Sequence, residues 1–268
     1  MSQYKIEAGT GQHIGDRREQ QDRVALFAAP KAPGTMMAVL ADGMGGRTGG
    51  AMAAEQVIRS AKQLFEEFAP ATHSIETVLQ TIAFEAHTII KLSGISAEKE
   101  PHSTMVVLIL TPTGSAHWAH VGDSRLYRFS GPNFAERTID HSFVESMVAQ
   151  GKFTPEQAKN HRLSNILVNV LGSMRDDPFV TLGRLDGLKP GDAFLLASDG
   201  LWHYFSDEEL GAAIAMNTPR GASEMLIRKA RERAEGMEAD NCSLAIVKLI
   251  APPPPEKGYT VQKMRRAV

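Results

Sequence analysis

The clearest feature of the hydrophobic pattern is an apolar run, Met36–Ala41, that ends in a single carboxylate, Asp42, followed by glycine. An uninterrupted apolar run of this length, bounded by glycine, predicts a strand that is buried on both faces. Apolar residues then recur at helical spacing over 50–68, which predicts a long helix. The segment therefore places a charged side chain and a glycine-rich loop at the mouth of a core strand.

The rest of the chain alternates between strand and helix patterns. Two short helices, within 142–150 and 154–157, interrupt the strands and indicate an inserted lobe, either a substrate-facing flap or a plain connection. The close spacing of three strands between 103 and 129 predicts an antiparallel meander. The remaining predicted helices cover 74–93, 206–216 and 220–235, and the predicted strands cover 24–27, 103–110, 115–121, 124–129, 180–185, 192–198 and 242–250.

Carboxylates lie beside the core strands at two further places. The run FLLASDG repeats the design of an apolar run followed by Asp-Gly and ends in Asp199, and Asp240 precedes the apolar CSLAIVKLI. Because oxygen ligands suit magnesium, manganese and calcium, three such carboxylates indicate a hard-cation site. A hairpin turn is the alternative for Asp42-Gly43, and a phosphate-binding loop lacks its Lys-Ser/Thr end.

Two polar segments carry further candidates. GDRREQQD, residues 15–22, reads as a solvated loop, or as a site in which Arg17 or Arg18 offers a guanidinium fork to phosphate and Asp22 joins the carboxylates. Asp123, in VGDSR, also follows an apolar strand. From its position it is either a turn residue or another metal ligand.

Composition narrows the class of protein. The chain has 268 residues, of which 43% are hydrophobic, so a single domain over 1–250 is the simplest organisation. The abrupt change to PPPPEKGYTVQKMRRAV predicts that 251–268 form a Pro-rich linker and a basic, disordered tail. A net charge of −2 gives no support for a nucleic-acid partner, and no apolar stretch is long enough for a membrane span. The single cysteine, Cys242, rules out an internal disulfide. We expect the protein to be cytoplasmic and monomeric.

Taken together, these motifs resemble the metal-dependent Ser/Thr protein phosphatases of the PPM, or PP2C, family. The likeness spans about residues 9 to 250, and the short DGMGG loop and the GDSR turn are shared with the bacterial members. The motifs stand in the family's order: GDRREQQD (15–22), LADGMGG (40–46), HSTMVV (102–107), VGDSR (121–125), DHS (140–142), the segment 165–172, ASDG (197–200) and DN (240–241).

The resemblance implies an α+β fold, a four-layer α-β-β-α sandwich of two antiparallel sheets flanked by helices. It also implies two Mn²⁺ or Mg²⁺ ions in the cleft between the sheets, and a third in bacterial relatives. Arg17 matches the phosphate-binding arginine, and Asp42 would bridge the two core ions. The implied catalytic residues are Arg17, Asp42 and Asp199. The implied metal ligands are Asp22 (directly or through water), Asp42, the Gly43 carbonyl, Asp199, Asp240, and, for the third ion together with Asp199, Asp123.

The implied reaction is the hydrolysis of phosphoserine and phosphothreonine in proteins by direct attack of a metal-activated water, because two close cations lower the pKa of water and offset phosphoryl charge. The implied partners are phosphorylated proteins and a cognate Ser/Thr kinase. Two departures stand out. Gln21 replaces a glutamate of some relatives, and Met44 replaces a histidine proposed as general acid in animal relatives. The alternative function is a pseudophosphatase that binds phosphoproteins without turnover.

Overall fold

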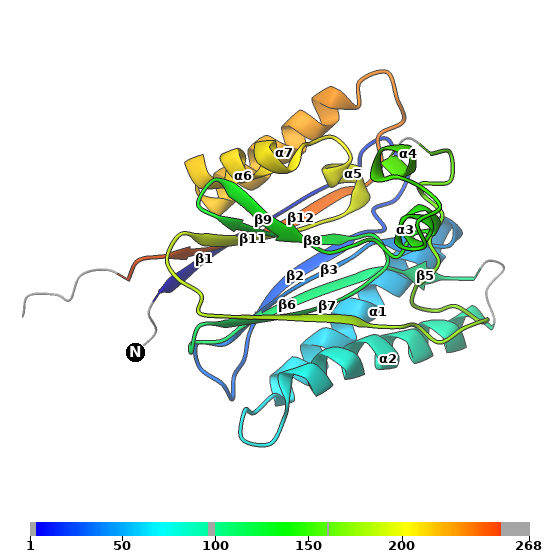
Figure 1. Ribbon diagram of the computed structural model, residues 1–268. Helices are drawn as coiled ribbons and strands as arrows, with labels where there is room; N and C mark the ends of the chain where they lie inside the picture. Colours follow the sequence, from blue (N-terminus) through cyan, green and yellow to red (C-terminus); the bar gives the residue numbers. More distant parts are fainter. Residues whose placement is uncertain (1–3, 96–99, 160, 253–268) are drawn as a thin grey trace, which may run out of the picture.

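The computed structural model describes residues 4–95, 100–159 and 161–252. Two five-stranded antiparallel sheets lie face to face, and pairs of helices cover their outer faces (Figure 1). The predicted α+β four-layer sandwich is therefore confirmed. Within the described ranges, no helix is both long and apolar enough to cross a membrane.

The first sheet carries two long helices on its outer face, α6 (Asp207–Met216) and α7 (Pro219–Arg233). A one-turn helix, α5 (Asp199–Trp202), follows the strand β11 directly. In spatial order the sheet consists of β1 (Lys5–His13), β12 (Cys242–Ile250), β11 (Asp192–Ala197), β8 (Arg125–Ser130) and β9 (Asn133–Arg137).

The second sheet is covered by α1 (Gly46–Glu67) and α2 (Ile75–Gly94). Helix α1 begins four residues before the predicted start at Gly50, so part of the glycine-rich segment is helical. The strands, in spatial order, are β10 (Thr181–Asp186), β7 (Ser115–Val121), β6 (Met105–Leu110), β3 (Met36–Ala41) and β2 (Arg23–Ala28), and a separate two-stranded pair joins β4 (Gly43–Met44) to β5 (His102–Ser103).

Strand β3 shows why its sequence is apolar without interruption. Val39 packs into the cluster formed with α1 and α2, whereas Leu40 packs between the two sheets, and both are fully buried. Successive side chains of a strand point to opposite faces, so a strand covered on both faces needs apolar residues at every position. The chain emerges from this core at Asp42.

The predicted meander over 103–129 is wrong at its third strand. Strands β6 and β7 pair as predicted, but β8 pairs with β11 and β9 in the other sheet. The crossover occurs at Gly122, whose φ of 97° only glycine adopts readily and whose position leaves no room for a Cβ, 2.7 Å from a Thr104 methyl. Asp123 is thus a residue of the crossover between sheets, and no hairpin turn forms there.

Strands β1 and β9 were missed by the hydrophobic pattern. β1 is an edge strand with alternating exposure, so few of its residues are apolar. It nonetheless pairs with β12 along its whole length. Its Gly9 lies under α7, where a Cβ would come within 2.8 Å of the Arg220 backbone, so close helix packing explains the glycine.

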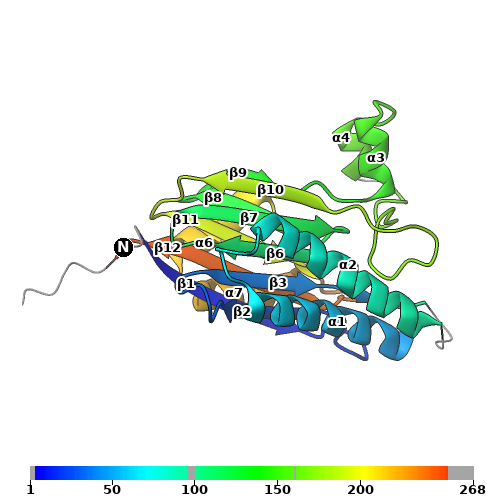
Figure 2. The same ribbon diagram turned by 90° about the horizontal axis from the view of Figure 1, so that it is seen from below.

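The predicted lobe is present as α3 (Phe143–Ala149) and α4 (Pro155–Lys159), and it projects from the sandwich (Figure 2). The predicted cap of the second helix is also confirmed. Gln157 N–H donates to Thr154 Oγ1, and Thr154 N–H donates to Gln157 Oε1. Of the predicted linker and tail, 251–268, all but the first two residues lie outside the described residues.

Candidate metal centre

Five aspartates gather at one end of both sheets. Asp42, Asp123 and Asp199 follow the C-terminal ends of β3, β7 and β11, and Asp22 and Asp240 precede β2 and β12. In an antiparallel sheet the C-terminal end of one strand lies beside the N-terminal end of its neighbour. All five positions therefore fall at the same end of the strands. Four of them, together with Arg17 and Gly43, line a cleft of about 510 Å³, and Asp22 lies behind it.

Mutual repulsion and burial dominate the electrostatics of this cleft. Burial, and then the charges of the four neighbouring aspartates, raise the pKa of Asp42 well above its usual range. Burial, and then the charges of Asp123, Asp240 and Asp22, raise the pKa of Asp199 to about 8. A site that crowds carboxylates in this way favours a bound cation, which would remove the repulsion.

Asp22 is the most deeply buried of the five, with only 1% of its surface exposed. Ser198 Oγ donates a hydrogen bond of 2.8 Å to Asp22 Oδ2. Burial is also the main cause that raises its pKa to about 6, and hydrogen bonds from Ser243 and Ser198 oppose the rise. Asp22 therefore supports the cluster from behind, in contact with Asp42, rather than from the cleft wall.

Arg17 and Asp240, predicted as a phosphate ligand and a metal ligand, bind each other in this structure. Arg17 Nε and Nη2 donate to Asp240 Oδ1 and Oδ2 at 2.9 and 2.8 Å, which is the bidentate geometry of guanidinium and carboxylate. Both side chains are more than 40% exposed, so the pair is accessible from the cleft. Arg18 lines the same cleft.

The carboxylates are not yet arranged as a finished ligand set. Among the residues that the structure describes, no three or more His, Cys, Asp or Glu side chains are already positioned to hold one ion. The contacts explain this, because Asp240 is turned to Arg17 and Asp22 to Ser198. The donor chemistry of these carboxylates fits a hard cation.

Comparison with known proteins decides the family. A sequence model of the family Protein phosphatase 2C matches residues 9–234, most of the chain. The chain belongs to the protein phosphatase 2C family.

Named relatives agree with this assignment. The chain is 31% identical to protein phosphatase PhpP of Streptococcus pneumoniae over 245 residues, which cover 88% of this chain and 94% of the relative. The serine/threonine phosphatase of S. agalactiae has a TM-score of 0.81 at 27% identity, over 91% of this chain and 99% of that structure. Stp1 of Staphylococcus aureus has a TM-score of 0.78 at 27% identity, over 91% of this chain and 95% of that structure.

The assignment confirms the resemblance, the fold class and the classification as a phosphoprotein phosphatase. The individual roles expected of Arg17 and the five aspartates remain predictions, although the structure brings these residues to one cleft.

The glycine-rich loop of this phosphatase 2C domain brings backbone to the cleft. A Cβ on Gly43 would lie 2.0 Å from Gly50 O, so no other residue fits there. Gln21 Nε2 donates to Gly46 O at 2.6 Å and thereby ties the loop down. A glutamate at position 21 has no N–H to donate, so the departure seen in the sequence has a structural use here.

Sequence reasoning missed the residues that hold Asp123 in place. Trp202 Nε1 donates to the Asp123 carbonyl at 3.1 Å, and the Arg125 guanidinium stacks on the Trp202 ring at 3.4 Å. Arg125 in turn forms a bidentate pair with Asp140 at 2.8 and 2.7 Å. Asp140 and Arg125 were visible in the DHS and VGDSR motifs, but their pairing depends on the hairpin of β8 and β9, and the pattern did not predict β9.

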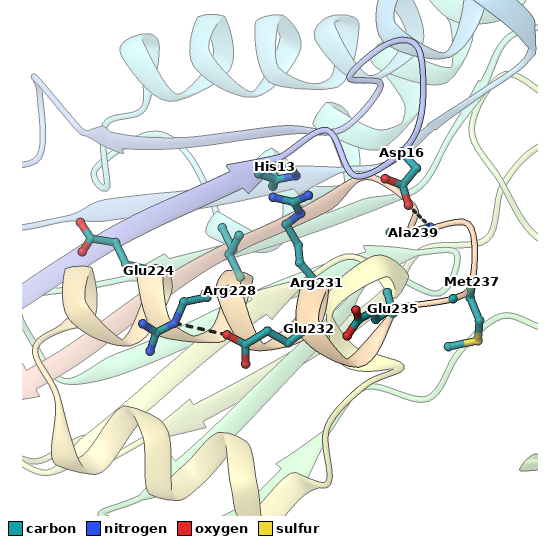
Figure 3. Close-up of a pocket in the computed structure, with 12 residues that line it drawn as sticks. His13, Asp16, Glu224, Arg228, Arg231, Glu232, Glu235, Met237 and Ala239 are labelled. Atoms are coloured by element: carbon teal, nitrogen blue, oxygen red, sulfur yellow. Dashed lines mark hydrogen bonds and ion pairs between the residues drawn. The ribbon is translucent and has the colours of Figure 1, made fainter.

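A larger cavity, of about 680 Å³, lies on the other side of the N-terminal loop, between β1 and the C-terminal half of α7 (Figure 3). Its walls include His13, Arg231 and Asp16, and none of the five cleft aspartates lines it. The size of a cavity therefore does not identify the reactive site in this domain, and the chemistry of the lining residues does.

Proposed function

We propose that this domain hydrolyses phosphoserine and phosphothreonine in proteins with the help of Mn²⁺ or Mg²⁺ bound in the aspartate cleft. One observation carries the proposal: the carboxylates of both sheets gather at one end of the strands, beside an arginine that is exposed to the cleft. Burial and mutual repulsion make this cluster unfavourable without a compensating charge. A divalent cation supplies that charge and the chemistry of phosphoester hydrolysis.

The proposed ligand set uses the positions named from the sequence. Asp42, at the centre of the cluster, would bridge two ions, and the backbone carbonyl of Gly43 would contribute to one of them. Asp199 and Asp240 would hold the other, and Asp123 with Asp199 would hold a third. Asp22 lies behind Asp42 and is better placed to act through water. When bound, the ions would lower the pKa of a water and offset the charge of the phosphoryl oxygens.

One solved structure of the same fold contains manganese. The catalytic domain of the serine/threonine protein phosphatase PstP was crystallised in complex with 2 manganese ions, and its TM-score against this chain is 0.74. At 23% identity this likeness covers the fold alone. The number and identity of the ions in this chain are therefore part of our proposal.

The chain's own side chains have distinct parts in the reaction. Arg17, once released from Asp240, would bind two phosphoryl oxygens with its guanidinium fork. Met44 lines the cleft and has no proton to give, so it cannot protonate the leaving serine or threonine oxygen, and a water, either held in the site or from solvent, would supply that proton. Within this account the domain acts as a monomer in the cytoplasm and reverses the action of a Ser/Thr kinase.

The test is hydrolysis of para-nitrophenyl phosphate by the purified protein in manganese and in chelator. We expect turnover that depends on the metal. Binding of phosphopeptides without any turnover in manganese would favour the pseudophosphatase instead. Turnover that is undiminished by chelator would contradict the metal centre.

A further inference from the structure

Two loops that supply cleft residues are joined on the side facing away from the cleft. Asp16 N–H donates to Ala239 O at 2.9 Å, and Ala239 N–H donates to Asp16 Oδ2 at 3.0 Å. Figure 3 shows the second bond at the edge of the large cavity, with the Asp16 carboxylate turned toward Ala239. This pair of reciprocal bonds, which we call the Asp16–Ala239 clasp, is formed by residues outside the metal ligands.

The clasp is adjacent in sequence to two cleft residues. Arg17 follows Asp16 and Asp240 follows Ala239, and these two form the bidentate pair of the cleft. Gly15 also packs on this loop, because a Cβ there would lie 2.2 Å from Asp240 O. A shift of one loop against the other would therefore move the guanidinium and the carboxylate together.

The segment that carries Asp240, residues 234–241, is neither helix nor strand. Helix α7 ends at Arg233, and the chain reaches β12 only at Cys242. Met237 in this stretch is 59% exposed. A second tie comes from Asn241, whose Nδ2 donates to the carbonyls of Ile14 and Glu19. The clasp and Asn241 thus hold the segment at two points, one on each side of Asp240.

We propose that Asp16 is a positioning residue that, through the clasp, sets Arg17 and Asp240 in the cleft. The inference deepens the proposed function and rests on it. Asp16 touches neither substrate nor metal, so its removal would weaken phosphate and metal binding while leaving the reaction of the fully loaded site nearly unchanged. Because Asn241 still holds the segment, the loss would be partial.

The test compares three variants of the full chain. Asp16→Ala removes the acceptor of the Ala239 N–H, whereas Asp16→Asn keeps a carbonyl oxygen that can accept it. Glu235→Ala is the matched control, because Glu235 is an exposed carboxylate on the wall of the same cavity with no part in the clasp. Amide hydrogen exchange at Ala239, calorimetric manganese binding and the kinetics with para-nitrophenyl phosphate are measured for each.

For Asp16→Ala we expect faster exchange at Ala239, and an increase of roughly three- to tenfold in KM and in the manganese dissociation constant, the effect of losing one net hydrogen bond. We expect kcat at saturating manganese to stay within about twofold. Asp16→Asn should restore both constants, and Glu235→Ala should leave them unchanged.

The inference is overturned if Asp16→Ala loses protection at Ala239 while KM and manganese affinity stay at wild-type values. It is equally overturned if Asp16→Ala only lowers the melting temperature, or if Glu235→Ala weakens both constants as much. Each of these results leaves the proposed function standing, because that function depends on turnover by the wild-type protein in manganese.

Discussion

The substitution Asp123→Asn separates a structural role of this residue from a metal-binding role. Asparagine has nearly the same shape, and the hydrogen bond from Trp202 goes to the backbone carbonyl, which the change leaves in place. What the change removes is one negative charge from the cleft. A structural residue would tolerate this loss, whereas a metal ligand would not.

The change in folding stability that Asp123→Asn causes in the metal-free protein can be worked out from the pKa of Asp123. Burial first, and then the charge of Asp140, raise it from 3.8 to about 6. A shift of this size sets an upper limit of about 3 kcal/mol on the cost of the ionised carboxylate in the folded state. Because the side chain is only half-buried and the cleft is open, we expect about 1 kcal/mol, and thus a gain of roughly 2–4 °C in melting temperature for the variant.

The stability difference between the variant and the wild type depends on pH. The folded state holds its proton up to about pH 6, whereas the unfolded chain loses it near pH 3.8. The wild-type protein therefore loses stability as pH rises through this window, and the variant, which has no such proton, does not. In chelator, the variant should melt higher than the wild type above pH 6, and the difference should vanish below about pH 4.

In manganese, by contrast, we expect the substitution Asp123→Asn to impair the protein, and the measured quantity is its activity. Asp123→Asn should hydrolyse para-nitrophenyl phosphate slower by about an order of magnitude or more, if a third ion positions or deprotonates a water. Calorimetry should still count the two ions of the core site. Wild-type rates with an unchanged metal count would return Asp123 to a purely structural role, and loss of a core ion would contradict the division of ligands proposed here.

Three further changes test other parts of the account. Asp42→Asn should nearly abolish turnover at saturating manganese without unfolding the protein, and circular dichroism beside kinetics checks this; activity within a few-fold of wild type would remove Asp42 from the centre of the site. Arg17→Ala should mainly raise KM, because a guanidinium fork binds phosphate in ground and transition states alike, and a larger effect from Arg18→Ala would mean that the neighbouring arginine binds phosphate. Deleting the chain from Pro252 onward should leave aryl-phosphate hydrolysis and melting temperature unchanged, because the last strand ends at Ile250; a large drop in melting temperature would show that the tail packs on the domain.

The apolar core strands could be predicted closely because burial on both faces leaves a strong signal. β3 and β12 have the bounds expected from the sequence. The edge strand β1 could not be predicted, because its side chains are alternately exposed and its glycines are there to let α7 pack closely against it. Strand β8 was predicted as a strand but assigned to the wrong sheet, because short loops look alike whether the chain turns back or crosses to another sheet.

The sequence predicted which residues form the candidate site, but it did not predict which of them contact one another. Each aspartate stood next to an apolar strand in the sequence, and antiparallel pairing brings those strand ends to one edge. The pairing of Arg17 with Asp240, and the stacking of Arg125 on Trp202, join residues that are far apart in the chain. No local pattern contains such contacts, because they form at the ends of strands that are neighbours in the first sheet but distant in the chain, β1 beside β12 and β8 beside β11.

The most direct test of the central claim is phosphate release from a phosphothreonine peptide by the wild-type protein and by Asp42→Asn, each in manganese and in chelator. The account predicts release by the wild-type protein in manganese alone, and almost none in the other three reactions. Release that continues in chelator, or that Asp42→Asn sustains at the wild-type rate, would contradict a metal centre built on the aspartate cleft.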